Sequence, residues 1–136
     1  MRFGVHLSIS KGLRETVRQA QELGCETIQI FSRSPRMWRT REINQEQARE
    51  FRVLLQQAGI HPLVVHTPYL PNLCTSDKRL YERSARAFRE DVDRAGMLGA
   101  QFLVIHPGAY SPDKTEQEGY DNLLTALDML IKPTAG

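Results

Sequence analysis

Three stretches of the sequence share one pattern, in which a glycine is followed closely by a short run of apolar and β-branched residues. The glycines are Gly24, Gly59 and Gly99, and the runs cover residues 27–31, 63–66 and 102–106. A glycine just past a helix readily takes the left-handed backbone that ends the helix. Unbroken apolar runs are typical of strands that are buried on both faces of a parallel sheet. Residues 2–7 supply a first run of the same kind, so the pattern predicts four strands separated by helices.

The segments between these runs have the period of amphipathic helices. Their apolar residues recur three and four positions apart, which places them on one face of a helix. Two of the expected helix starts carry capping-box spacing, Asn44 with Gln47 and Thr115 with Glu118. The order βαβαβαβα implies a parallel sheet with right-handed crossovers.

The length of the chain restricts how many such units it can hold. Four units fill 136 residues, whereas a closed eight-unit barrel needs roughly 250. One alternative is a small open α/β domain with four strands. The other is a single domain over residues 1–136 that forms the parallel (β/α)4 N-terminal half of a (β/α)8 TIM barrel. Because the fourth helix is also followed by a glycine, Gly136, we expect this half-barrel to stop just before strand 5.

The composition excludes several classes of protein. The chain is 40% hydrophobic and 25% charged, and its net charge of +2 is too small to mark a nucleic-acid binder by itself. No apolar run reaches the 18 residues of a membrane span, and the N-terminus has no signal-peptide pattern. Cys25 and Cys74 are the two cysteines and form no CxxC pair, so we expect a reduced, cytoplasmic chain with free thiols and no membrane contact.

Histidines occupy three of the four predicted strand ends. They are His6, His66 and His106, whereas His61 lies at the start of a strand, where we expect a structural role. In parallel α/β folds the active site lies at the carboxyl ends of the strands. One such histidine could simply be a packed, hydrogen-bonded residue. Three on one rim favour a metal site, because neutral imidazole is the commonest protein ligand for metals.

The loop after the second strand is the basic part of the chain. Residues 32–41 read SRSPRMWRTR, with Arg33, Arg36 and Arg39 close to Trp38 and no acidic residue among them. Arginines beside a large aromatic residue can neutralise phosphates and stack on or enter between bases. The alternative is a solvated loop whose tryptophan packs on a neighbouring helix. Tyr69, in the next loop along the rim, has few apolar neighbours in sequence, which the chemistry of a simple turn does not explain.

Several catalytic motifs are missing from the sequence. There is no phosphate-binding glycine loop, no nucleophile elbow, and no aspartate or glutamate at any predicted strand end. Metal centres that cleave phosphodiesters need bridging carboxylates to hold two cations about 3.5–4 Å apart. Histidines alone cannot provide such a bridge.

With these residues in view, the chain resembles endonuclease IV, the zinc-dependent apurinic/apyrimidinic endonucleases of base-excision DNA repair. The similar motifs occur in order along all 136 residues: GVHLS with GL after it, FSRSPRMW, HTPY with NL after it, and HPG. The resemblance implies a TIM barrel that binds duplex DNA at abasic sites and holds three zinc ions at its mouth. It implies that these ions activate hydroxide to cleave the phosphodiester 5′ to the site.

The resemblance also assigns roles to individual residues. His66 and His106 match two zinc ligands of the family, and His6 matches a position in the substrate pocket. Arg36 and Tyr69 match residues that enter the DNA and hold the abasic nucleotide out of the helix. We expect Arg33, Trp38 and Arg39 to contact DNA beside them.

The sequence departs from the family in one large respect. The family's bridging glutamate lies on strand 5, and its remaining ligands follow later. Aligning the final residues, IKPTAG, to the strand-5 motif would put Lys132 where that glutamate belongs. We therefore expect a truncated endonuclease IV that has at most two zinc ligands, is inactive alone, and forms a dimer or larger assembly through its open edges. The alternatives are a sugar isomerase or epimerase of the same barrel class and a non-catalytic half-barrel paralogue.

Overall fold

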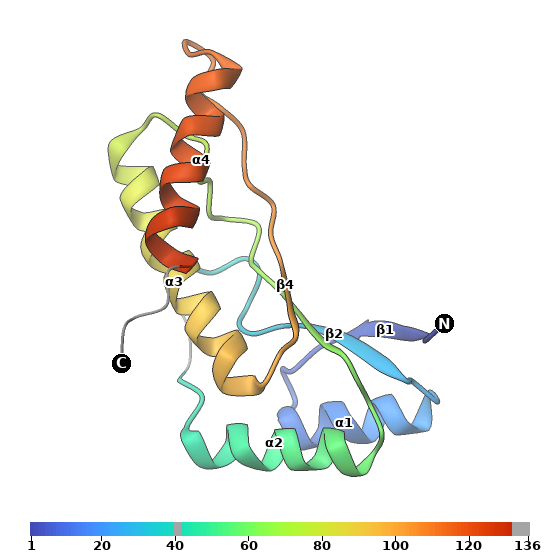
Figure 1. Cartoon of the computed structure of the whole chain (residues 1–136). Coiled ribbons are helices and arrows are strands. Elements are labelled where there is room, and N and C mark those ends of the chain that lie inside the picture. The colour runs from blue at the N-terminus through green and yellow to red at the C-terminus, as the bar shows by residue number, and fades with distance from the viewer. Residues whose placement is uncertain (40–41, 132–136) are drawn as a thin grey trace.

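The computed structural model describes residues 1–39 and 42–131 and shows strands and helices in strict alternation (Figure 1). In chain order the elements are β1 (Gly4–Leu7), α1 (Leu13–Glu22), β2 (Thr27–Phe31), α2 (Gln45–Gln57), β3 (Leu63–His66), α3 (Lys78–Leu98), β4 (Phe102–Val104) and α4 (Glu116–Ile131). The strands form one parallel sheet in the order β1-β2-β3-β4. The βαβαβαβα order and the parallel sheet are therefore confirmed. Gly136, on which the expected end point of the half-barrel depends, lies outside the described residues.

Local chemistry sets the helix ends as the sequence predicts. Gly24, Gly59 and Gly99 all have positive φ, between 67° and 77°, a conformation that costs glycine little because it lacks a Cβ. The backbone N–H of Gln47 donates to Asn44 Oδ1 over 2.7 Å at the start of α2. Satisfying such free N–H groups stabilises the first turn of a helix. These caps confirm the predicted helix boundaries and, with them, the points at which the strands begin.

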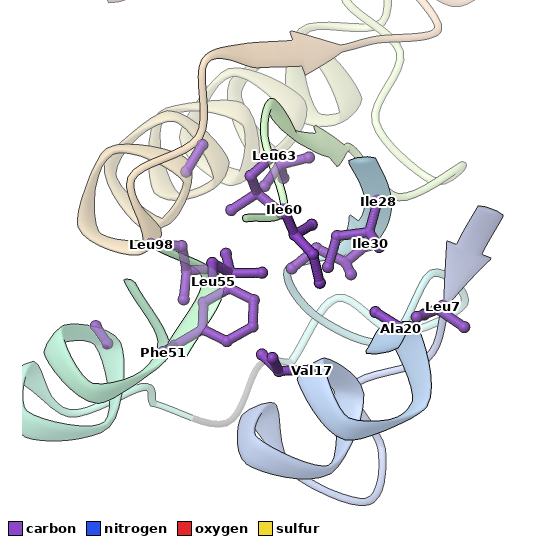
Figure 2. Close-up of a cluster of buried hydrophobic side chains, with 13 residues drawn as sticks. Leu7, Val17, Ala20, Ile28, Ile30, Phe51, Leu55, Ile60, Leu63 and Leu98 are labelled. Carbon is purple, nitrogen blue, oxygen red and sulfur yellow. The ribbon is translucent and has the colours of Figure 1, made fainter. Parts of the chain in front are cut away.

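The main core lies between the sheet and the helices (Figure 2). Ile28 and Ile30 of β2 point toward the helices and are fully buried, as is Leu63 of β3. Phe51 of α2 and Leu98 of α3 meet them from the helix layer. Because side chains alternate between the two faces of a strand, this packing turns Gln29, Phe31 and His66 toward the opposite face.

That opposite face of the sheet has no layer of its own within the described part of the chain. All four helices lie on one side of the strands, and α1, α2, α3 and α4 contact one another in sequence (Figure 1). Phe102 and Val104 of β4 are 59% and 39% exposed on the other side. Helices on one side of a parallel sheet, with apolar residues on the bare face, are the arrangement of an arc cut from a (β/α)8 barrel, whose interior is the bare face.

Two strands are shorter than the sequence patterns suggest. β1 begins at Gly4 rather than at residue 2, and β4 ends at Val104 rather than at residue 106. Both are edge strands of this sheet, so each has a strand neighbour on one side alone and its pairing ends early. His106 consequently lies two residues beyond β4 instead of at its last position. No helix of the described residues has the length and apolar character needed to cross a membrane.

Candidate active-site rim and nucleic-acid interface

The three predicted histidines converge at the carboxyl ends of the strands. The ring centroids of His66 and His106 are 4.9 Å apart, and those of His6 and His66 are 6.3 Å apart. Phe31 and Tyr69 complete the group, with ring centroids 5.1 and 5.9 Å from that of His66. We call these five residues the rim cluster. His66 and His106 thus lie close together, whereas their role as metal ligands stays a prediction.

A backbone contact places a proton on Nδ1 of His66. Its Nδ1 lies 2.6 Å from the carbonyl oxygen of Thr67. A carbonyl oxygen can only accept a hydrogen bond, so Nδ1 carries the proton and donates it. The lone pair of Nε2 is then available, which is how metal-binding histidines are usually held in place. The ring itself is buried, so it has little freedom to turn away.

His6 has the opposite arrangement of its ring nitrogens. The side-chain amide of Gln29 donates from Nε2 to His6 Nδ1 over 2.8 Å, and the parallel register sets the two residues side by side on β1 and β2. Burial, and secondarily the nearby His66, lower the pKa of His6 below its ordinary value. A neutral His6 that accepts at Nδ1 carries its proton on Nε2. In this arrangement the Nε2–H of His6 can donate a hydrogen bond.

The described residues do not make up a complete metal site. Among them, no group of three or more histidine, cysteine, aspartate or glutamate side chains lies close enough to hold a metal ion. His66 and His106 form a pair of imidazoles, whereas zinc in proteins has three or four protein ligands. These residues could hold one side of a metal centre but cannot complete it, so no catalytic step follows from them alone.

The exposed part of the basic loop lies beside the rim cluster. Arg36, Met37 and Arg39 are exposed. Tyr69 is 60% exposed although its ring lies against that of His106 in the rim cluster. The backbone N–H of Tyr69 donates to the carbonyl of Pro35 over 3.3 Å. This bond joins the loop after β2 to the loop after β3, immediately next to Arg36. The structure therefore brings the predicted DNA-contacting residues Arg36 and Tyr69 into neighbouring positions.

Arg33 is placed differently from what the sequence predicts. Its side chain is buried, and Nη2 donates to Asp91 Oδ2 over 2.8 Å and to the carbonyl of Ala87 over 2.7 Å. Arg33 is therefore not at the surface in this structure, where Asp91 of α3 holds it, and its expected contact with DNA stays a prediction.

Trp38 follows the alternative that the sequence left open. Its ring is half-buried and lies 4.1 Å below the guanidinium carbon of Arg83 on α3, in a cation–π contact. The tryptophan thus packs against a neighbouring helix. Its indole is a support of the loop here, and direct contact with DNA stays a prediction.

A cleft of about 1060 Å³ opens beside the rim cluster between the loops that follow β1 and β2. His6, Phe31, Lys11, Met37 and Arg39 are among the residues that line it. Lys11 and Gln29 are not among the residues that the sequence patterns predict for the site. Gln29 could have been found, since a polar residue that alternates with Ile28 and Ile30 must face the barrel interior.

The half-barrel, with imidazoles and cations at the carboxyl end of its sheet, places the chain in one class of protein. The chain belongs to the xylose isomerase-like TIM barrel family, whose model matches residues 17–135. It is 40% identical over 148 residues to "Probable endonuclease 4" from Cenarchaeum symbiosum (strain A), an alignment that covers 100% of this chain and 52% of the relative. The chain thus spans about half the length of the curated relatives it matches.

Solved structures separate the endonucleases from other barrels. Endonuclease IV from Thermus thermophilus superposes with a TM-score of 0.80 and 35% identity, over 96% of this chain and 47% of that one. D-psicose 3-epimerase from Clostridium cellulolyticum gives a TM-score of 0.66 with 14% identity, over 96% and 48% of the two chains. The epimerase shares the fold alone. The similarity to the endonucleases extends to the sequence, which makes this an endonuclease IV-like protein.

The imidazole pair predicts how the 136-residue chain responds to zinc. We expect weak, substoichiometric Zn²⁺ binding that is lost in His66→Gln and in His106→Gln, because glutamine keeps the bulk but lacks the imidazole lone pair. Isothermal titration calorimetry measures the affinity and stoichiometry of Zn²⁺ binding. His61→Gln is the matched control and should leave binding unchanged, since His61 is exposed and precedes β3 at the opposite end. Tight binding of three zinc ions by this chain alone would contradict the expectation.

Proposed function

We propose that this chain is a DNA-repair protein of the endonuclease IV type, and that it recognises abasic sites in duplex DNA. One observation carries the proposal: the rim cluster joins three imidazoles to an exposed tyrosine and lies beside a loop with the exposed arginines Arg36 and Arg39. The 35% identity with an endonuclease IV of the same fold supports it. A sugar epimerase would need acidic ligands around a small pocket and would have no use for an exposed arginine loop.

A few side chains would each make a different contact with the DNA. Arg36 and Arg39 are exposed and have no carboxylate partner among the described residues, so both are available to phosphates. Tyr69 inserts at the abasic site, where no base pair has to be broken and flipping is inexpensive. His6 donates from Nε2 to an oxygen of the displaced sugar or its phosphate. Recognition then depends on the missing base rather than on sequence.

The chain contributes to metal chemistry through two residues. His66 and His106 would bind zinc through imidazole nitrogens, and bound zinc would supply the activated hydroxide that cleaves the phosphodiester 5′ to the abasic site. A bridging carboxylate and further ligands must come from outside the described residues. We therefore infer that the 136-residue chain binds abasic DNA but does not cleave it, even with added zinc.

Its cysteines are free thiols, which supports a reducing compartment, the cytoplasm.

We further propose that the 136-residue chain associates through its bare sheet face and edges. β1 and β4 each present unpaired backbone groups along one side, and Phe102 and Val104 expose apolar surface on the bare face. A second copy could pair its β1 with β4 of the first and close a barrel with twofold symmetry. That arrangement would cover Phe102 and Val104 and bring four rim imidazoles, His66 and His106 of each copy, to one mouth.

The first prediction from this proposal concerns salt. The double variant Arg36→Ala/Arg39→Ala should reduce the slope of log Kobs against log salt concentration by about 2, because two phosphate contacts are lost. Fluorescence anisotropy with a labelled abasic duplex, measured over a range of salt, gives the slope. Arg18→Ala is the control, since Arg18 on α1 is already paired with Glu15 and Glu22. An unchanged slope in the double variant would leave the loop with no role in binding phosphate.

The second prediction concerns the state of assembly. Light scattering should give a mass of about twice 15.6 kDa or more, and Phe102→Lys should lower it, because a charge on the bare face opposes burial of that face. Leu124→Lys on the exposed side of α4 is the matched control and should leave the mass unchanged. A stable 15.6 kDa monomer that unfolds cooperatively would instead favour a self-sufficient open sheet.

A further inference from the structure

A buried cluster of charges lies between the loop after β2 and helix α3. Asp91 is fully buried, and its carboxylate accepts from Arg33 Nη2 over 2.8 Å and from Ser32 Oγ over 3.3 Å. Arg33 also reaches Glu90, whose carboxylate lies 3.3 Å from Nη1. The partners are far apart in sequence, since 58 residues separate Arg33 from Asp91.

Such a cluster is a poor way to gain stability. Burying two charges is costly, and well-packed apolar side chains in place of a buried ion pair are often as stable or more so. Burial also raises the pKa of Asp91, while its contact with Arg33 acts in the opposite direction. Unlike an apolar pair, an ion pair forms directional hydrogen bonds, and each of these bonds fixes the position of one group relative to another.

The groups that the cluster fixes are the two ends of the loop that carries Arg36. At the start of the loop, Arg94 of α3 donates to the carbonyl of Ser32. At its far end, Arg33 Nη1 lies 3.5 Å from the carbonyl of Trp38. Arg83, one further residue of α3, covers the Trp38 ring. Both ends are thus attached to α3, and the segment between them, which holds Arg36 and Met37, projects into solvent.

The attachment continues from this loop to the next one. The carbonyl of Pro35 accepts the N–H of Tyr69, so the position of the loop after β2 also sets the backbone of the proposed inserting tyrosine. A shift of the loop on α3 would therefore move Arg36 and Tyr69 together relative to the imidazoles.

We propose that Asp91 is a positioning residue for DNA recognition: through Arg33 it anchors the loop of residues 32–39 to α3 and so places Arg36 and Tyr69 at the rim. The assignment of Arg36 and Tyr69 to DNA rests on the proposed function, whereas the anchoring of the loop does not. Asp91 itself is buried and touches no ligand. Its effect is carried by the charge-assisted hydrogen bonds that Arg33 makes to it.

The chain contains its own reporter of this anchoring. Trp38 is the single tryptophan, so the intrinsic fluorescence of the whole chain reports on this loop. In Asp91→Asn the carboxylate is lost while size is retained. We expect stronger acrylamide quenching and red-shifted emission of Trp38, together with about a tenfold loss of affinity for an abasic duplex. Asp93→Asn is the matched control on the same helix, since Asp93 is exposed, and it should leave both readouts as in the wild type.

A double variant separates positioning from stability. Arg33→Met/Asp91→Leu replaces the ion pair with apolar side chains. Arg94, which also faces Asp91, keeps Glu90 as a nearby acid, and we expect the unfolding temperature to be near that of the wild type. Trp38 should nonetheless remain readily quenched and DNA affinity low, because the bond to the Trp38 carbonyl is missing. This variant also serves if Asp91→Asn does not fold. Restoration of both Trp38 shielding and DNA affinity in the double variant would overturn the proposal.

The two readouts fail independently of each other. Quenching of Trp38 that is unchanged in Asp91→Asn would overturn the anchoring, whatever the chain does with DNA. Full DNA affinity in Asp91→Asn, with the wild type binding the abasic duplex, would also overturn the positioning role. Altered quenching in a protein whose wild type binds no DNA would support the anchoring and overturn the proposed function.

Discussion

The site depends on the parallel register of the four strands. Because every connection crosses over through a helix on the same side, all carboxyl ends meet at one edge, and alternate side chains face the barrel interior. The pairing of Phe31 with His66, and of His6 with Gln29, follows directly from this register. A shift by one residue in either pairing would turn these side chains into the helix layer. The rim cluster exists because the core residues on the other face, such as Ile28, Ile30 and Leu63, fix that register.

Within the rim cluster, small differences in bonding give the histidines different capabilities. His66 donates from Nδ1 to a carbonyl and keeps Nε2 as a ligand, whereas His6 accepts an amide at Nδ1 and keeps Nε2–H as a donor. Two residues of the same type can therefore serve metal binding and substrate binding side by side. The arrangement does not form a complete metal site, since no group of three or more histidine, cysteine, aspartate or glutamate side chains comes together among the described residues. A binding role for the chain is consistent with what it contains.

The sequence predicts the fold well because the relevant signals are local. Glycines with positive φ, capping residues and apolar runs each act within a few positions, and they suffice to order the strands and helices and to place three histidines at one edge. Whether an individual arginine is buried or exposed is not decided by its neighbours in the sequence. Arg33 and Arg36 have similar neighbours in SRSPRMWRTR. Arg33 is buried because it pairs with Asp91, which lies 58 positions later in the sequence, whereas Arg36 is exposed. The stacking of Arg83 on Trp38 is hidden from the sequence for the same reason.

The central claim is that this half-barrel recognises a missing base through Tyr69 at the rim. The most direct measurement compares the affinity of the 136-residue chain for two duplexes that differ only in one abasic position, for the wild type and for Tyr69→Ala. The wild type should prefer the abasic duplex, and Tyr69→Ala should lose that preference while keeping its affinity for the intact duplex. Tyr120→Ala, which removes an exposed tyrosine from α4, should behave as the wild type. Equal affinity of the wild type for both duplexes, or an equal loss on both in Tyr69→Ala, would contradict the account.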